Sequence, residues 1–269
     1  MSDLPRPSAH HPRRALLRAF RPFARTGVRA YWDLHVHGAE HIPSDGPVIF
    51  ASNHAGWLDG PLLAIVSPQP VHALTKQEMF DGLMGRLLTG AGQIPLDRFG
   101  ADPGAIKSCL RVLQDGGAIG IFPEGTRGAG ELDVFHHGVT YLALVSGAPV
   151  VPVTQVGTRE PGGGTNSMPP RRARIDMAYG ETWRTTRTPW PRTREHTLAT
   201  SVLLWQHLRD QQAHALALIG RRLPGPLPAG DREVEPDTGF VDHSDSVADT
   251  PHHQPDQQAD TPADQQGAS

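Results

Sequence analysis

The sequence predicts an α/β fold in which a mixed, mostly parallel β-sheet is covered by helices on both faces. Segments with strand composition alternate with segments of helical periodicity along most of the 269 residues. Two of the strand segments, 117–122 and 148–156, are apolar almost throughout instead of alternating apolar and polar residues. Such strands are buried on both faces, which is typical of parallel sheets between two helical layers.

The first half of the chain is divided into short elements by glycine and proline. The expected elements are a helix at 13–32, strands at 33–38 and 47–52, a helix from 59 to about 66, a strand at 70–75 and a helix at 77–90. Pro22 predicts a kink or a restart in the first helix. Asp59-Gly60-Pro61 predicts the start of the second, because Asp is a favoured N-cap and Pro is favoured in the first turn.

The second half continues the alternation. The expected elements are an amphipathic helix at 102–115, a buried strand at 117–122, a helix at 137–146, a buried strand at 148–156, an edge strand at 172–180 and a long amphipathic helix at 194–220. Ile106, Leu110 and Leu113 have the spacing of one helix face, which supports the first of these.

Charge divides the chain into three regions. Residues 1–32 carry seven Arg and one acid and form a basic amphipathic helical segment. Residues 33–222 form the folded domain. Residues 223–269 are rich in Pro, Asp, Gln, His and Gly and are predicted to be a disordered acidic tail, because they cannot bury enough apolar surface to offset the entropy of ordering.

Composition excludes several classes of protein. Cys109 is the only cysteine, so neither a disulfide nor a cysteine-rich zinc site can form within the chain. The 15 histidines show no clean zinc spacing, and no metal is predicted. The net charge of −3 and the lack of a matching motif argue against nucleic acid as a partner. The uncharged stretch Val139–Thr158 is interrupted by Gly and Pro, so the chain is expected to lie on a membrane instead of crossing it.

The first chemical motif is SNHAGWLDG, residues 52–60, between an apolar strand and a helix. On a turn, the Asp59 carboxylate can fold back to His54, fix its tautomer and make it a general base. The structural alternative is that Asp59 only caps the helix and that His54 is a satisfied core histidine.

Three further motifs follow in order. GQIPLDR (92–98) ends in Arg98, which could clamp a phosphate or could be an ordinary loop arginine. FPEGTRG (122–128) follows a buried strand, where α/β sheets place ligands, but it could be a simple turn with Glu124 paired to Arg127. APVVPV (148–153) contains two prolines, so this strand must begin or bulge there, in a core or beside an apolar ligand.

The ordered set NHxxxxD, GxIPxxR, FPEGTR and a proline-bearing apolar strand resembles the glycerolipid acyltransferases, that is, the 1-acylglycerol-3-phosphate acyltransferases (PlsC-type) and their relatives. The resemblance covers roughly residues 33–180 and includes Thr75-Lys76-Gln77-Glu78, which looks like that family's Lys-x-Glu segment. Region 33–222 would then be the acyltransferase domain. The chain departs from the family's pattern at Gly56, where many relatives have Ser or Thr, and at His136, where many have Lys; the second departure makes the anionic headgroup less certain.

The resemblance also implies roles. His54 would be the base and Asp59 its orienting partner. The acceptor's phosphate would be bound by Arg98, in a pocket shaped by Glu124, Gly125, Thr126 and Arg127, with Lys76 assisting. Pro149 and Pro152 would form the acyl-donor side.

The expected reaction is transfer of an acyl group from acyl-CoA or acyl carrier protein to the sn-2 hydroxyl of 1-acylglycerol 3-phosphate, without a bound cofactor or a covalent enzyme intermediate, since no G-x-S-x-G motif is present. Other acceptors remain open: another lysophospholipid, a lyso-ornithine lipid or a glycolipid. Two other classes also remain open, a hydrolase and a non-catalytic peripheral lipid-binding protein.

A membrane surface is the expected partner. Arg14, Arg18, Arg21, Arg25 and Arg29 fall on one stripe of the first helix, and most of its apolar residues fall on the opposite side. Such a helix suits an anionic surface, and the expected location is peripheral, on the cytoplasmic face of the cell membrane. The alternative is a helix packed on the domain with a solvated Arg face.

Overall fold

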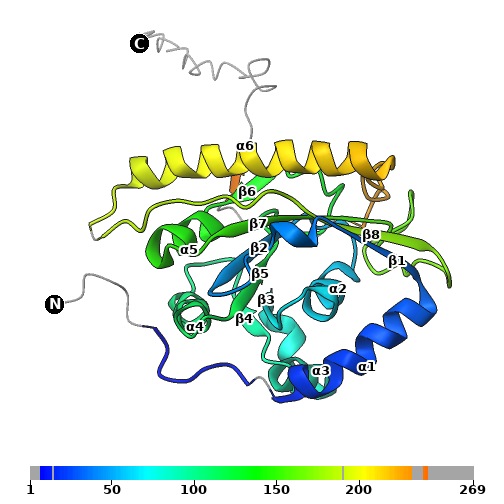
Figure 1. Cartoon of the computed structure of the whole chain (residues 1–269), viewed down its shortest axis with the longest axis horizontal. Helices are drawn as coiled ribbons and strands as arrows, with labels where there is room; N and C mark the ends of the chain where they lie inside the picture. Colours follow the sequence, from blue (N-terminus) through cyan, green and yellow to red (C-terminus); the bar gives the residue numbers. More distant parts are fainter. Residues whose placement is uncertain (1–6, 14, 190, 232–238, 242–269) are drawn as a thin grey trace, which may run out of the picture.

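The computed structural model describes residues 7–13, 15–189, 191–231 and 239–241. Its centre is a seven-stranded sheet in the order β1-β8-β7-β2-β5-β3-β4 (Figure 1). The strands are β1 (Asp33–His37), β2 (Val48–Ser52), β3 (Val71–Lys76), β4 (Ile94–Leu96), β5 (Ala118–Ile121), β7 (Val150–Val156) and β8 (Arg174–Tyr179). A small second sheet pairs β6 (Val134–His136) with β9 (Gly239–Val241).

Neighbouring strands of the large sheet are parallel, except that β7 and β8 are antiparallel. The predicted mixed, mostly parallel sheet is therefore confirmed. The prediction that the strand at 172–180 lies at an edge is wrong, because β8 pairs with β1 on one side and β7 on the other. Residues 175–179 are all buried, so both faces of β8 are covered, as is typical of a strand inside the sheet.

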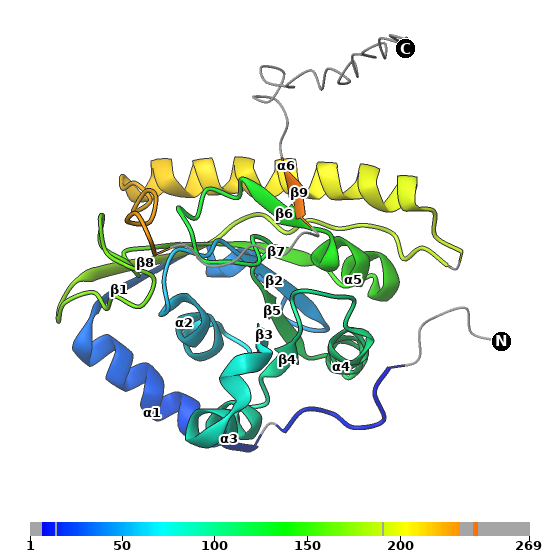
Figure 2. The same cartoon turned by 180° about the vertical axis from the view of Figure 1, so that it is seen from behind.

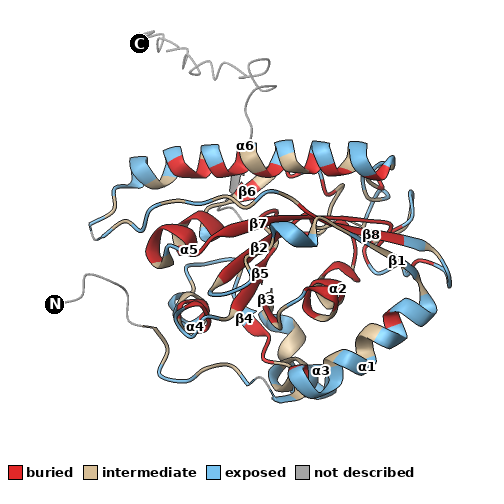
Figure 3. Ribbon diagram, viewed as in Figure 1, coloured by how far each residue is buried: buried red, intermediate tan, exposed pale blue. Residues whose placement is uncertain are grey.

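Helices cover both faces of this sheet, as predicted. They are α1 (Ala15–Tyr31), α2 (Asp59–Val66), α3 (Gly82–Gly90), α4 (Pro103–Gln114), α5 (Gly138–Ser146) and α6 (Arg194–Ile219), with 3₁₀ turns η1 (Ala39–His41) and η2 (Gln77–Phe80). Figure 2 shows α4, α5 and α6 on one side of the strands and α1 and α2 on the other. Successive β2 side chains alternate between these layers, Ile49 toward α4, α5 and α6 and Phe50 toward α2. Both layers are buried along the central strands (Figure 3).

Two helix predictions need correction. The expected helix at 77–90 is divided into η2 and α3, because Asp81 is extended and Gly82 has a φ of 60°. α1 continues through Pro22 without a restart.

The arginine stripe of α1 does not face solvent along its whole length. Arg21 and Arg25 donate to the carbonyls of Ile65 and Val66 at the end of α2, which lack helical partners. Arg18 and Arg29 are exposed, and Arg14 lies outside the described residues. Phe20 and Phe23 are 62% and 77% exposed. The exposed face of α1 is thus apolar as well as basic.

The chain after α6 remains on the domain beyond the expected boundary at 223. The Gly225 carbonyl accepts a hydrogen bond from Arg159, and the Asp231 carboxylate accepts one from the Thr165 amide. The described chain thus contacts the domain as far as Asp231. The remainder of the predicted tail lies outside the described residues, apart from β9.

Candidate active site

The turn between β2 and α2 holds the predicted catalytic pair. Asp59 is fully buried, and its Oδ2 accepts hydrogen bonds from His54 Nδ1 at 2.9 Å, Ala55 N at 2.7 Å and Gly56 N at 2.8 Å. Asp59 is the first residue of α2, yet its carboxylate binds the preceding loop and makes no cap bond to the helix. The carboxylate therefore orients His54, as the sequence predicted, and the helix-cap alternative is not what the structure shows.

His54 is fixed at three points. Its amide donates to Glu124 Oε1 at 2.8 Å, its carbonyl accepts from Gly128 N at 2.9 Å, and its ring stacks on Phe122 with centroids 4.1 Å apart. Because a carboxylate can only accept, Nδ1 carries the proton of the neutral ring. The lone pair is then on Nε2, the nitrogen that a substrate hydroxyl would meet.

A buried polar network holds this turn from behind. The Asn53 side chain donates to the Gln155 carbonyl and accepts from the Gln155 amide, at 3.1 and 2.8 Å. Gln155 Nε2 donates to Ser52 Oγ and to the Asp59 carbonyl. Sequence analysis missed this role. The sequence signal was an amide side chain within a largely apolar strand, and the structure leaves Gln155 only 1% exposed.

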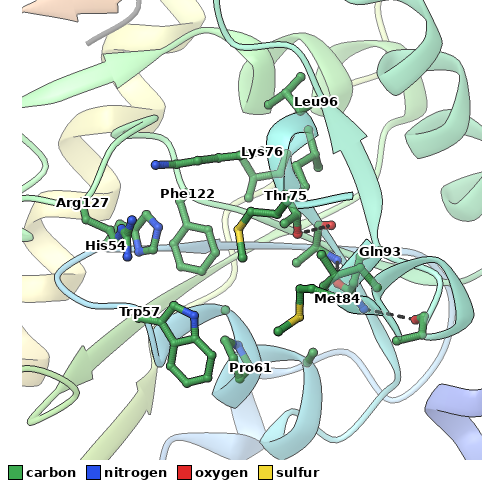
Figure 4. A pocket seen from close by; sticks show the side chains of 18 of the residues that line it. His54, Trp57, Pro61, Thr75, Lys76, Met84, Gln93, Leu96, Phe122 and Arg127 are labelled. Carbon is green, nitrogen blue, oxygen red and sulfur yellow. Dashed lines mark hydrogen bonds between the residues drawn. The ribbon is translucent and has the colours of Figure 1, made fainter. Parts of the chain in front are cut away.

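The structure brings three of the sequence motifs together around one cavity of about 340 Å³ (Figure 4). His54, Arg98 and Arg127 line it with Lys76 and Gly125. Arg98 also donates to the Gly125 carbonyl at 3.0 Å, which joins the second motif to the third.

The rest of the cavity wall is largely apolar. Its lining from α2, β3, η2, α3 and β4 includes Pro61, Ala64, Ile65, Ala73, Met79, Met84, Leu87, Leu88 and Leu96. Lys76 extends toward the side where His54 and Arg127 lie (Figure 4). The cavity therefore presents a base and fixed positive charge on one side of an apolar space.

Glu124 and Thr126 are not among the residues that line the cavity, and both are buried, at 7% exposure each. Burial raises the pKa of the Glu124 carboxyl to about 8, and the negative charge of Asp59 acts in the same direction against the lowering effect of the His54 amide. Glu124 is thus mostly neutral at pH 7. It supports His54 and does not pair with Arg127, whose Nη1 donates to the Thr165 carbonyl and Asn166 Oδ1.

The two prolines expected on the acyl-donor side are buried in the sheet. The Pro149 carbonyl accepts from Ile49 N, and Pro152 pairs with Ala51. Neither lines the cavity. The expected strand start is present, because β7 begins at Val150, directly after Pro149. The extra residue between the pair Val153–Tyr179 and the bridge Val150–Trp183 lies in the partner segment and not in β7. These prolines shape the sheet, and the structure does not support their assignment to the donor.

The segment from β1 to the end of β7 matches a known protein family. Residues 33–156 match the family model described as Acyltransferase. The matched segment is therefore similar to acyltransferase domains. The fold of the chain is shared with the crystal structure of the 1-acyl-sn-glycerophosphate acyltransferase PlsC from Thermotoga maritima, at a TM-score of 0.57 and 21% identity over 76% of this chain and 80% of that one.

Curated relatives of the acyltransferase domain have related names. A 1-acyl-sn-glycerol-3-phosphate acyltransferase of Bacillus subtilis is 32% identical over 135 residues, which is 49% of this chain and 64% of that protein. The chloroplastic 1-acyl-sn-glycerol-3-phosphate acyltransferase BAT2 of Brassica napus is 32% identical over 143 residues, 51% of this chain and 41% of that protein. The matched part thus spans less than two thirds of the length of these relatives.

Proposed function

We propose that this protein transfers a fatty acyl group from acyl-CoA or acyl carrier protein to the sn-2 hydroxyl of 1-acylglycerol 3-phosphate, giving phosphatidic acid for phospholipid biosynthesis. The observation that carries the proposal is the His54–Asp59 pair, 2.9 Å apart, at an apolar cavity that also presents Lys76, Arg98 and Arg127. The relatives described above are named as acyltransferases for the same class of acceptor.

His54 acts as the general base. Its Nε2 accepts the proton of the acceptor hydroxyl while the hydroxyl oxygen attacks the thioester carbonyl carbon. The tetrahedral intermediate then collapses, the carbon–sulfur bond breaks, and the imidazolium returns its proton to the departing thiolate. Asp59 stabilises the imidazolium in the interval. The thioester is already activated, so no covalent enzyme intermediate, metal or bound cofactor is required, and positioning supplies much of the rate.

The acceptor's phosphate is bound by the three cations. A guanidinium binds phosphate oxygens through charge-assisted hydrogen bonds. Arg98 and Arg127 come from different loops that line the same cavity, and the hydrogen bond from Arg98 to the Gly125 carbonyl joins these loops. The neutral state of Glu124 at pH 7 removes a repulsion that a buried carboxylate would exert on an anionic headgroup. An acyl chain occupies the apolar part of the cavity, because that surface gains from leaving water.

The lipid substrate is reached by peripheral binding to the cytoplasmic face of the cell membrane. Phe20 and Phe23 of α1 and Leu83 and Leu87 of α3 are at least half exposed. The two helices lie side by side (Figure 1), and both contribute residues to the cavity wall. Exposed arginines of α1 add attraction to anionic lipids. Among the described residues, no helix is long and apolar enough to cross a bilayer.

A lysolipid panel tests the proposal. The purified protein is assayed with one acyl-CoA, then with acyl carrier protein, against 1-acylglycerol 3-phosphate and other lysolipids. His54→Ala should abolish acylation. His37→Ala is the matched control, because His37 pairs with buried Asp176 at 3.0 Å outside the cavity.

Three outcomes would overturn the proposal. Turnover retained by His54→Ala would remove the base. Thioester consumption without an acylated product would indicate a hydrolase. No thioester consumption with any acceptor would indicate a non-catalytic lipid-binding protein.

A further inference from the structure

Arg159, just after β7, is a charged side chain buried deep in the protein. It is 1% exposed, and its guanidinium donates to backbone carbonyls from four separate segments. The acceptors are Ala55 at 2.8 Å, Gly163 at 2.8 Å, Gly128 at 2.9 Å and Gly225 at 2.5 Å. The planar guanidinium has five N–H donors in fixed directions, so it can bind four chain segments at once. An ammonium group lacks such fixed donor directions.

Two of these segments hold His54, the proposed base: one contains it and the other binds its carbonyl. The Ala55 carbonyl belongs to the same residue whose amide donates to Asp59, next to His54. Gly128 donates its amide to the His54 carbonyl and accepts from Arg159 through its own carbonyl. Displacement of Arg159 would therefore loosen the backbone that follows His54 and the Gly128 segment that binds the His54 carbonyl.

Gly56 provides a second observation on the same contact. A Cβ at this position would lie 3.1 Å from the Thr158 carbonyl oxygen and 3.2 Å from Arg159 Cβ, closer than ordinary van der Waals contact. The turn thus packs directly against Arg159. A side chain at position 56 would require this contact to shift.

The segment after α6 reaches the phosphate side of the cavity by another path. Asp231 accepts from Thr165 N at 2.6 Å and from Thr165 Oγ1 at 3.1 Å. The Thr165 carbonyl in turn accepts from Arg127 Nη1 and from Trp57 N, each at 3.1 Å. Both Arg127 and Trp57 line the cavity. Asp231 therefore fixes a carbonyl on which two cavity residues depend.

We propose that Arg159 and Asp231 are positioning residues for acyl transfer: Arg159 holds the His54–Gly56 turn, and Asp231 holds Arg127 through Thr165. The proposal rests on the function proposed above. Neither residue lines the cavity, so each acts through another side chain. Residues 221–231 become part of the active-site architecture instead of a tail.

The two residues should affect different kinetic constants. Arg159→Met removes the fork and leaves four carbonyls without their donor, and a base displaced by about 1 Å lowers kcat by about 10²-fold with little change in acceptor KM. Arg159→Lys keeps the charge and restores part of that loss. Asp231→Asn weakens a charge-assisted bond and raises acceptor KM about tenfold with kcat nearly unchanged.

Arg187→Met is the matched control. Arg187 also donates to a backbone carbonyl, that of Val145. Neither Arg187 nor Val145 lines the cavity. Its kcat and KM should stay at the wild-type values. Partial recovery of Arg159→Ala by added guanidinium would identify the missing fork and not a general loss of fold.

Hydrogen exchange gives a readout that does not depend on turnover. Arg159→Met should raise exchange at the Gly128 amide, and Asp231→Asn should raise it at the Thr165 and Trp57 amides, while the amides of β2 stay protected. If the wild type acylates no acceptor, the proposed function fails while the exchange result still decides the positioning roles. Wild-type kinetics in both variants, or exchange no different from Arg187→Met, would overturn the proposal.

Discussion

Glu124→Gln is expected to change how the stability of the protein depends on pH. In the folded protein, burial raises the pKa of Glu124 from 4.5 to about 8. Between these two values the folded chain keeps a proton that the unfolded chain releases. Stability therefore falls as pH rises through this window. A glutamine is neutral in both states and removes this contribution.

The magnitude follows from the two pKa values. One proton of difference changes the unfolding free energy by about 1.4 kcal/mol per pH unit. From about pH 5.5 to about pH 7.5, the wild type should lose about 2 to 3 kcal/mol more than Glu124→Gln. Typical domains have about 5–15 kcal/mol of stability, so the difference is measurable.

Urea unfolding at the two pH values, followed by tryptophan fluorescence, gives the free energies. For each protein, the change in unfolding free energy between the two pH values is measured first. The contributions of the other titrating groups cancel when the change in the variant is subtracted from the change in the wild type. Glu160→Gln is the control, because Glu160 is exposed, and it should keep the wild-type pH dependence. Equal pH slopes in wild type and Glu124→Gln would refute the reasoning and mean that Glu124 is ionised in the folded protein.

Three further outcomes are expected. Asp59→Asn should lower kcat by roughly 10³- to 10⁴-fold, because an amide does not fix the tautomer or stabilise the imidazolium; loss of less than tenfold would contradict the role. Ala64→Phe, on the cavity wall, should shift preference toward shorter acyl donors in a mixed-chain competition, and an unchanged product profile would place the chain elsewhere. Phe20→Ser with Phe23→Ser should weaken vesicle binding by at least about tenfold, since each buried Phe contributes about 1.5–3 kcal/mol. Leu203→Ser, 60% exposed on α6, is the vesicle control and should bind like wild type.

The convergence of three motifs on one cavity could be predicted from the sequence. SNHAGWLDG and FPEGTRG each follow an apolar strand, and neighbouring parallel strands end at the same edge of a sheet. β2 and β5 are such neighbours, which brings His54 to Glu124 and Phe122. Spacing within one motif does not show that β2 and β5 are neighbours, so the expectation that the motifs meet depended on their ordered resemblance to a known family.

The order of the strands at the far side of the sheet could not be predicted. The placement of β8 between β1 and β7 depends on pairing between segments about 140 residues apart, and local periodicity contains no information on such pairing. The role of Arg159 was hidden for the same reason. Its four acceptors are backbone carbonyls, which look the same in any sequence, and they meet only after folding.

Under the proposed function, the site separates the proton transfer from the choice of acyl chain. The amide, carbonyl and Nδ1 of His54 are all bound within the protein, and Asp59 is held by two amides, so the base is oriented before substrate arrives. The acyl part of the cavity is formed instead by flexible side chains such as Met79 and Met84, next to the helix break at Asp81 and Gly82. Substitutions on η2 and α3 should therefore alter chain-length preference with little effect on the proton transfer. Substitutions around His54 should slow every acyl chain alike.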